Sequence, residues 1–132
     1  MSKHKEISDK DILKIAMAII DLLIATGEWF DTCVYFLNHA FCTNGYFHYR
    51  KPAYYIFRTS GEKVEKICVI SNVRAEDYLK LHGGILSIAI DGFSNCIYGD
   101  TDIRYAINHI LTPYRLYLET GEHWNFSVYP ID

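Results

Sequence analysis

The chain lacks the composition of a disordered or low-complexity protein. Its 132 residues include only three prolines, 22% are charged, and half are hydrophobic. Disordered chains cannot bury enough apolar surface to fold, whereas this composition can. The length matches a common domain size, so we expect residues 1–132 to form a single domain with a sizeable core.

An excess of one charge is also missing. The 13 basic and 16 acidic residues are mixed along the chain and give a net charge of −3, so no basic stripe for duplex nucleic acid is evident. The longest apolar stretch, residues 12–25, is interrupted by Lys14 and Asp21 and is too short to cross a bilayer as a helix. We therefore expect a cytoplasmic protein that binds neither duplex nucleic acid nor membranes.

The cysteines show no paired spacing of the kind that marks disulfide or zinc sites. The four are Cys33, Cys42, Cys68 and Cys96. They lie in hydrophobic or strand-like runs, which predicts reduced thiols packed in a core. Cys33 and Cys42 are each followed by a histidine six residues later, but zinc sites use shorter separations and a second ligand pair nearby. We expect neither a metal nor a cofactor.

No catalytic motif is recognisable. Gly83 and Gly84 follow an expected helix and precede an expected strand, whereas phosphate-binding loops run from a strand into a helix. None of the cysteines follows a glycine-rich elbow or opens a clear helix, where thiolates are activated. The sequence therefore favours a protein that is not an enzyme.

The clearest element that is present is an N-terminal helix. Ser8 to Asp11 resemble an N-terminal capping box, and the helix they open is expected to run to Thr26, with Gly27 as its stop. Its middle is apolar on nearly all sides, so we expect it to lie between a sheet and a second surface. Another subunit is the expected second surface, which predicts a homodimer or higher homo-oligomer.

Residues 31–47 allow two interpretations. Five residues follow helical spacing: Cys33, Phe36, Leu37, Ala40 and Phe41. Asn44-Gly45 between aromatic residues is instead typical of a hairpin. We predict a helix that ends at Asn44-Gly45 and keep the hairpin as the alternative.

After Pro52 the hydrophobic pattern changes to a period of two, which indicates strands. Three hairpins are predicted, from residues 53–59 and 64–71, 85–90 and 93–98, and 114–119 and 123–129. Short helices are predicted at residues 74–82 and 101–111, between the hairpins. The predicted fold is α+β, with two N-terminal helices followed by an antiparallel sheet of three hairpins separated by short helices.

The loop lengths also predict which residues face each other. In the first hairpin Arg58 is expected opposite Glu65 and Ile56 opposite Ile67. In the second, Asp91-Gly92 sets Ile90 against Phe93 and Leu86 against Ile97. In the third, an odd loop sets Leu118 and Leu116 against Trp124 and Phe126, and the other face collects Arg115, Tyr117, Glu119, His123, Asn125 and Ser127.

Tyrosine is unusually frequent, with 11 residues, and concentrates beside basic residues. One candidate binding surface takes Tyr46, His48, Tyr49, Arg50 and Tyr54 from residues 46–55. Tyrosine and arginine give recognition surfaces a large contact area with a polar end. The competing interpretation is that these tyrosines only cover the edges of the sheet.

A second candidate surface is the polar face of the last hairpin. Arg115, Tyr117, His123 and Asn125 there would suit an anionic or aromatic ligand such as a nucleotide. An ordinary solvated sheet face is the competing interpretation.

Three functions are compatible with these features. The first is a non-catalytic protein that recognises or inhibits a protein partner stoichiometrically, as an inhibitor, an immunity protein or a phage counter-defence factor does. The second is sequestration of a small nucleotide-like ligand in a pocket between the sheet and the first helix. The third is a small enzyme with His123 or His48 as general base near a carboxylate. We rank them in that order.

Overall fold

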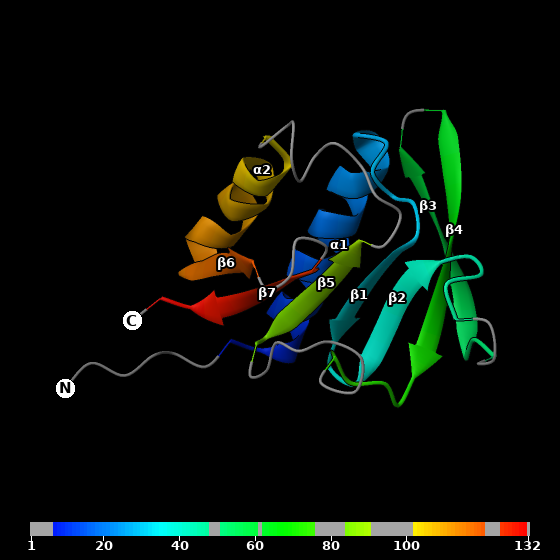
Figure 1. Ribbon diagram of the computed structural model, residues 1–132, viewed down its shortest axis with the longest axis horizontal. Coiled ribbons are helices and arrows are strands. Elements are labelled where there is room, and N and C mark those ends of the chain that lie inside the picture. Colours follow the sequence, from blue (N-terminus) through cyan, green and yellow to red (C-terminus); the bar gives the residue numbers. More distant parts are fainter. Residues whose placement is uncertain are drawn as a thin grey trace.

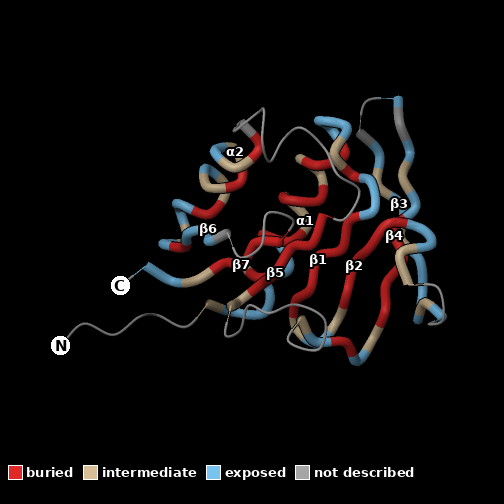
Figure 2. Tube along the Cα trace, in the orientation of Figure 1, coloured by how far each residue is buried: buried red, intermediate tan, exposed pale blue. Residues whose placement is uncertain are grey.

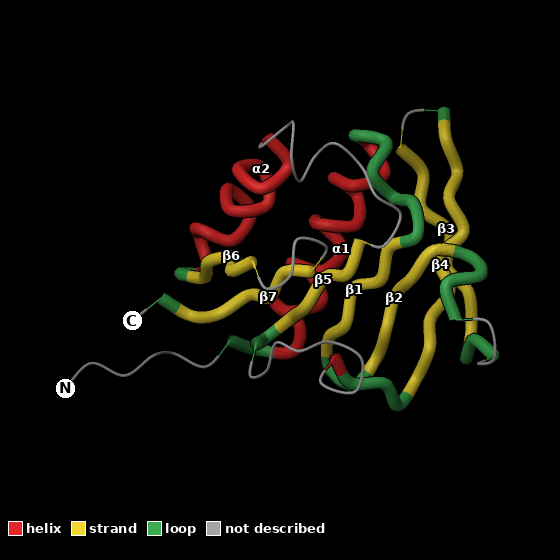
Figure 3. The backbone as a smooth tube through the Cα atoms, viewed as in Figure 1, coloured by secondary structure: helices red, strands yellow, loops and turns green. Residues whose placement is uncertain are grey.

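The computed structural model describes residues 7–47, 51–60, 62–75, 84–90, 102–120 and 125–131. The predicted strand 93–98, and the predicted helix 74–82 beyond its first two residues, lie outside these ranges. The described residues form an α+β fold, as predicted, in which two helices lie on one face of an antiparallel sheet (Figures 1 and 3).

Helix α1 (Asp9–Ala25) begins where the sequence predicts and ends one residue before the predicted end, with Thr26 as its C-cap. The Ser8 side chain accepts a hydrogen bond of 3.1 Å from the backbone N–H of Asp11, which satisfies one of the amides that have no partner inside the helix. After Ala25 the chain reaches Gly27, whose φ of +80° suits glycine and ends the helix. The start of the helix and its stop before Gly27 are therefore confirmed.

Strands β1 (Thr32–Phe36) and β2 (His39–Thr43) replace the helix predicted over residues 31–43, so that prediction is wrong. The turn between the strands is Leu37-Asn38, whose φ values of 51° and 61° suit the right-handed twist of a tight hairpin. All five residues of β1 are buried on one face or the other. Such a strand has no polar face, so its sequence does not show a period of two. Its pattern therefore resembles that of a buried helix.

The other described strands are β3 (Tyr54–Ser60), β4 (Lys63–Ser71), β5 (Leu86–Ile90), β6 (Leu116–Thr120) and β7 (Asn125–Pro130). Within the described ranges they complete a seven-stranded sheet with the order β3-β4-β2-β1-β5-β7-β6. Helix α2 (Asp102–Leu111) and a 3-10 turn at Thr112–Tyr114 precede β6. Among the described residues, α1 alone precedes the first strand, whereas the sequence predicted two helices there.

The hairpin of β3 and β4 has the predicted register. Arg58 lies opposite Glu65, and Ile56 lies opposite Ile67. The strands continue one residue further toward the turn than predicted, to Ser60 and Lys63. The pairing of opposite charges and of apolar side chains across the strands was sufficient to predict the register.

Strand β5 pairs with two strands that are distant in the sequence. One of its edges pairs with β1, where Ser87 lies opposite Tyr35, and the other pairs with β7, where Leu86 lies opposite Val128. The partners predicted for Leu86 and Ile90, which are Ile97 and Phe93, lie outside the described residues. A turn signal such as Asp91-Gly92 is local and carries no information about strands distant in the sequence.

The hairpin of β6 and β7 has the predicted facing but a different register. Leu118 lies opposite Val128, not Trp124, and Thr120 lies opposite Phe126. The shift preserves which side chains share a face, because it is an even number of residues. Leu116, Phe126 and Val128 are accordingly buried together in the core under the helices.

The sheet has a core on each face. The larger core lies between the sheet and the two helices, and includes Ile19, Leu23, Ile88 and Phe126. The smaller core lies on the opposite face and is built around Cys33, Tyr35, Cys42, Cys68 and Ile70. Figure 2 shows the central strands buried and the outer part of the β3–β4 hairpin exposed. The hairpin therefore extends beyond the well-packed part of the sheet.

Most of the apolar surface of α1 is covered within one chain. Its buried residues pack against the sheet, and α2 contacts a further side of the helix. Leu13 is the large hydrophobic residue of α1 that stays well exposed. Neither described helix is long and apolar enough to cross a membrane. Helix α2 therefore covers part of the apolar surface of α1 that suggested a second subunit.

Candidate functional site

The first candidate surface is only partly within the described residues. Tyr46 is half-buried and packs edge-on against Phe47, with ring centroids 5.3 Å apart, beside the smaller core. Tyr54 lies on β3 and is half exposed. His48, Tyr49 and Arg50 lie outside the described ranges. Tyr46 therefore packs in the structure, while Tyr54 is accessible.

The described residues of the second candidate surface do not share one accessible face. Arg115 is exposed and has a left-handed conformation, with φ of 58°, at the start of the β6–β7 hairpin. Tyr117 is partly exposed and contacts Tyr129 at 5.9 Å between ring centroids. Asn125 is completely buried near the other end of the hairpin, and His123 lies outside the described ranges.

The two candidate surfaces are also remote from each other. Tyr54 is on β3 and Tyr117 is on β6, and these strands form opposite edges of the described sheet. No single ligand of ordinary size contacts both surfaces. They have to be considered as separate sites.

An exposed apolar surface lies next to Tyr54, on the neighbouring residues of the same hairpin. Tyr55, Phe57 and Val64 are 45%, 64% and 63% exposed. The register places Tyr55 and Phe57 on one face of β3, and Val64 on the same face of β4. Strand β2 pairs with β4 only from Ile67 onward, so the part of the hairpin that carries Phe57 and Val64 projects past β2. We call Tyr55, Phe57 and Val64 the hairpin patch.

Two cations of the hairpin, Arg58 and Lys66, make contacts within the chain. Arg58 donates to Asp21 of α1 through two nitrogens, Nε at 2.9 Å and Nη2 at 2.5 Å. This hydrogen-bonded pairing raises the pKa of Arg58. Lys66 Nζ lies 4.0 Å from the ring centroid of Tyr55, a cation–π contact. The hairpin patch is therefore apolar and aromatic rather than strongly basic.

Three cysteines lie side by side across three strands of the smaller core. Cys33 is opposite Cys42, and Cys42 is opposite Cys68. All three are buried thiols outside any disulfide, as expected for core cysteines, while Cys96 lies outside the described ranges. Burial is the main cause that raises the pKa of the Cys68 thiol, and the neighbouring Cys42 raises it further. Burial likewise raises the pKa of the Tyr35 hydroxyl in the same core.

Two histidines are described, and neither is paired with a carboxylate. His39 Nδ1 is 2.7 Å from the backbone oxygen of Leu37, and His109 is exposed on α2. No group of three metal-ligating side chains is found in the part of the chain that the structure describes. The described residues thus offer no assembled general base or metal centre.

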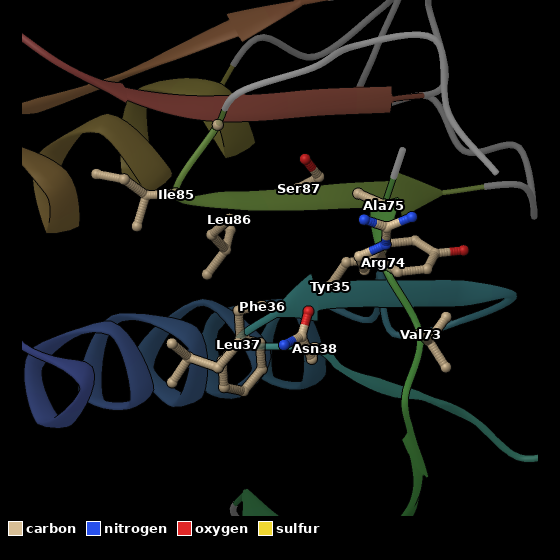
Figure 4. Close-up of a pocket in the computed structure, with 11 residues that line it drawn as sticks. Tyr35, Phe36, Leu37, Asn38, Val73, Arg74, Ala75, Ile85, Leu86 and Ser87 are labelled. Atoms are coloured by element: carbon tan, nitrogen blue, oxygen red, sulfur yellow. The ribbon is translucent and has the colours of Figure 1, made fainter. Parts of the chain in front are cut away.

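A cavity of about 200 Å³ lies at the end of β1 and β5, and Arg74 is among its lining residues (Figure 4). Neither this cavity nor the hairpin patch was proposed from the sequence. The alternation of Tyr55 and Phe57 was a usable signal for the patch, since both face one side of a strand. The cavity had no local signal, because its residues come from three separate segments.

Comparisons of the chain with protein-family models, with curated proteins and with solved structures gave no match.

Proposed function

We propose that the protein acts without catalysis, by binding a protein partner stoichiometrically through the hairpin patch. The observation that carries this proposal is the exposure of Phe57 and Val64, each more than 60%, on one face of a projecting hairpin. Contiguous exposed apolar side chains on a folded chain are typical of interaction sites. Aromatic residues are also enriched among the anchors of protein interfaces.

The edge position of β3 supports the same proposal. Within the described sheet, β3 pairs only with β4, so its outer edge presents backbone donors and acceptors along Tyr54–Ser60. Proteins commonly protect such an edge with proline, a bulge or inward-pointing charges. The strand itself has no proline or glycine, and its one charge, on Arg58, is held by Asp21. An extended segment of a partner can add to this edge.

The charge of the hairpin favours a protein over a nucleic acid. Its three basic residues alternate with Glu62 and Glu65. Arg58 and Lys66 already make the contacts with Asp21 and Tyr55 described above. Nucleic acids require cations that are available to phosphates, and the patch offers mainly apolar area.

The proposal is tested by photo-crosslinking in cells of the native host. Phe57 is replaced by the photo-reactive amino acid p-benzoylphenylalanine, and Tyr105 is replaced in a matched control. Tyr105 is 72% exposed on α2, away from the patch, so it reports contacts of an unrelated aromatic position. The expected result is a crosslinked protein specific to position 57. Equal products from both positions, or none from position 57, would overturn the proposal.

The same experiment tests the predicted homo-oligomer. A product that contains only this chain, with the crosslink from Phe57 to a second copy, identifies the partner as another subunit. Light scattering should then show a dimer whose mass falls when Phe57 is changed to serine. A product that contains a different protein assigns the hairpin patch to recognition of another chain, as the inhibitor hypothesis requires.

Sequestration of a small ligand is the second candidate function, and one observation favours it. The cavity lined by Arg74 combines a guanidinium with apolar side chains, although it does not lie between the sheet and α1, where the sequence suggested a pocket.

A further inference from the structure

The outer edge of β3 carries backbone groups that β4 does not use. Within the described residues, β3 pairs with β4 and with no other strand. Ser60 lies opposite Lys63, and the sequence places two residues between them, so their backbone groups close a two-residue hairpin by hydrogen bonding. Hydrogen-bonded and non-bonded pairs alternate along an antiparallel ladder. Tyr55, Phe57 and Thr59 therefore direct their N–H and C=O groups away from β4.

The order of side chains along β3 is complementary to a second copy of the same strand. In antiparallel pairing about a two-fold axis beside Ile56, this residue lies opposite Ile56 of the second copy. Tyr55 then lies opposite Phe57, and Tyr54 lies opposite Arg58, in both halves of the contact. Cross-strand pairs of two aromatic or two aliphatic side chains are favourable. This register therefore matches β3 to itself along its length.

Charge also favours this register. Arg58 is the charged residue of β3, and Asp21 of the same chain holds its guanidinium. With the axis beside Ile56, no two charged residues of the paired strands lie opposite each other. With the axis beside Arg58, two guanidinium groups would be directly opposite, which is unfavourable. With the axis beside Phe57, Ile56 would face Arg58 twice and lose its aliphatic partner.

We infer that two copies of the chain form a homodimer by pairing their β3 edges about Ile56 into one continuous sheet. The two pairs of Tyr55 with Phe57 exchange backbone hydrogen bonds, as hydrogen-bonded pairs of a ladder do. Addition of a strand to an exposed sheet edge is a common mode of association. Because the contact is two-fold and uses the same edge of both copies, it closes on itself and stops at a dimer.

The pairing also joins the two hairpin patches. Residues that lie opposite each other in a sheet share a face, so Tyr55 and Phe57 of both copies lie side by side. The backbone edge makes the contact, and the face of the joined patch stays accessible. The dimer therefore goes beyond the proposed function and does not depend on it. Only the use of the joined patch by a different protein rests on that proposal.

The dimer is tested by analytical ultracentrifugation of the purified full chain, which should sediment as a concentration-dependent dimer. Phe57→Pro removes an outward N–H from each copy, and proline is tolerated at such an edge position. It should raise the dissociation constant of the dimer about tenfold or more above that of Phe57→Ser, which keeps the N–H. A parent chain that stays monomeric at millimolar concentration, or equal constants for the two folded variants, would overturn the inference.

Disulfide crosslinking locates the two-fold axis without the proline variant. In Ile56→Cys the two introduced thiols lie opposite each other in a non-hydrogen-bonded pair, with Cα atoms about 4.5 Å apart, so mild oxidation should link the copies. Thr59→Cys is the matched control on the same strand. Thr59 is exposed whereas Ile56 is half-buried, so random collisions would favour position 59. Equal or stronger linkage through position 59, or none through position 56, would overturn the assignment.

These outcomes are distinguishable from those of the proposed function. A chain that is monomeric in solution, but crosslinks from position 57 to a different protein in cells, would overturn the dimer alone. A dimer whose position 57 crosslinks only to its own second copy would support the inference, and would leave the joined patch without a different protein as partner.

Discussion

Arg58 of β3 and Asp21 of α1 join the projecting hairpin to the helical layer through a two-point ion pair, with Nε to Oδ1 at 2.9 Å and Nη2 to Oδ2 at 2.5 Å. Both side chains are partly exposed, at 39% and 45%, so water screens the attraction. We expect the pair to orient the hairpin more than it adds to overall stability.

The first prediction concerns this ion pair. Asp21→Asn should lower the free energy of unfolding by only about 0.5–1 kcal/mol, the range for partly exposed pairs. It should also accelerate amide hydrogen exchange along β3, because the hairpin loses its link to α1. Exchange that accelerates uniformly over the whole sheet, or not at all, would argue against an anchoring role.

The second prediction concerns the β1–β2 turn, where Asn38 has a positive φ of 61°. Asn38→Ala should destabilise the protein by about 1 kcal/mol, because alanine is disfavoured in that conformation. Asn38→Gly should remain within about 0.5 kcal/mol of the parent. In the helix first predicted for this segment, alanine would instead stabilise, by about 0.5 kcal/mol. Chemical denaturation of the two variants therefore distinguishes the two interpretations.

The sequence predicted those elements that carry their own boundaries. Ser8 and Gly27 delimit α1. The cross-strand pairs of Arg58 with Glu65 and of Ile56 with Ile67 fix the register of the first hairpin. It misled where a strand is buried on both faces, as in Thr32–Phe36, since the polar alternation that marks a strand is then absent. The Leu37-Asn38 turn gave little warning, because leucine rarely adopts a positive φ.

The candidate sites were harder to predict, for a reason that Asn125 illustrates. Its place in a polar alternation predicted an accessible face, yet it is fully buried. Whether a sheet face is covered depends on distant segments, which a local pattern does not reveal. The same holds for the cavity, because the fold alone brings residues 38 and 74 to one lining.

The third prediction concerns two hydroxyls buried on the face of the sheet that lies opposite the helices. Ser87 Oγ and Ser127 Oγ are 2.7 Å apart, and both residues are almost inaccessible. Either single change to alanine should cost about 1–2 kcal/mol, since it leaves the other hydroxyl buried without this partner. The double change should cost clearly less than the sum. Additive costs in a double-mutant cycle would show that the two hydroxyls do not act as a pair.

The fourth prediction concerns the thiols. Cys33, Cys42 and Cys68 should react with Ellman's reagent only on unfolding, and elemental analysis should find no stoichiometric zinc. Because burial raises the pKa of Cys68 in the folded state, its contribution to stability is present below the ordinary thiol pKa and is lost as the pH rises through the raised value. Cys68→Ala should flatten the alkaline fall in stability. Rapid labelling of the native protein would contradict the buried arrangement.

The most direct test of the central claim is the dissociation constant of the partner identified by crosslinking, measured for the parent chain, Phe57→Ser and the control Tyr105→Ser. Phe57 is 64% exposed, so its replacement should leave the melting temperature nearly unchanged. Loss of an interface anchor typically costs about 2 kcal/mol, which corresponds to roughly thirtyfold weaker binding. We predict that loss for Phe57→Ser and parental affinity for Tyr105→Ser. Parental affinity in a folded Phe57→Ser protein would contradict the assignment of the hairpin patch as the binding surface.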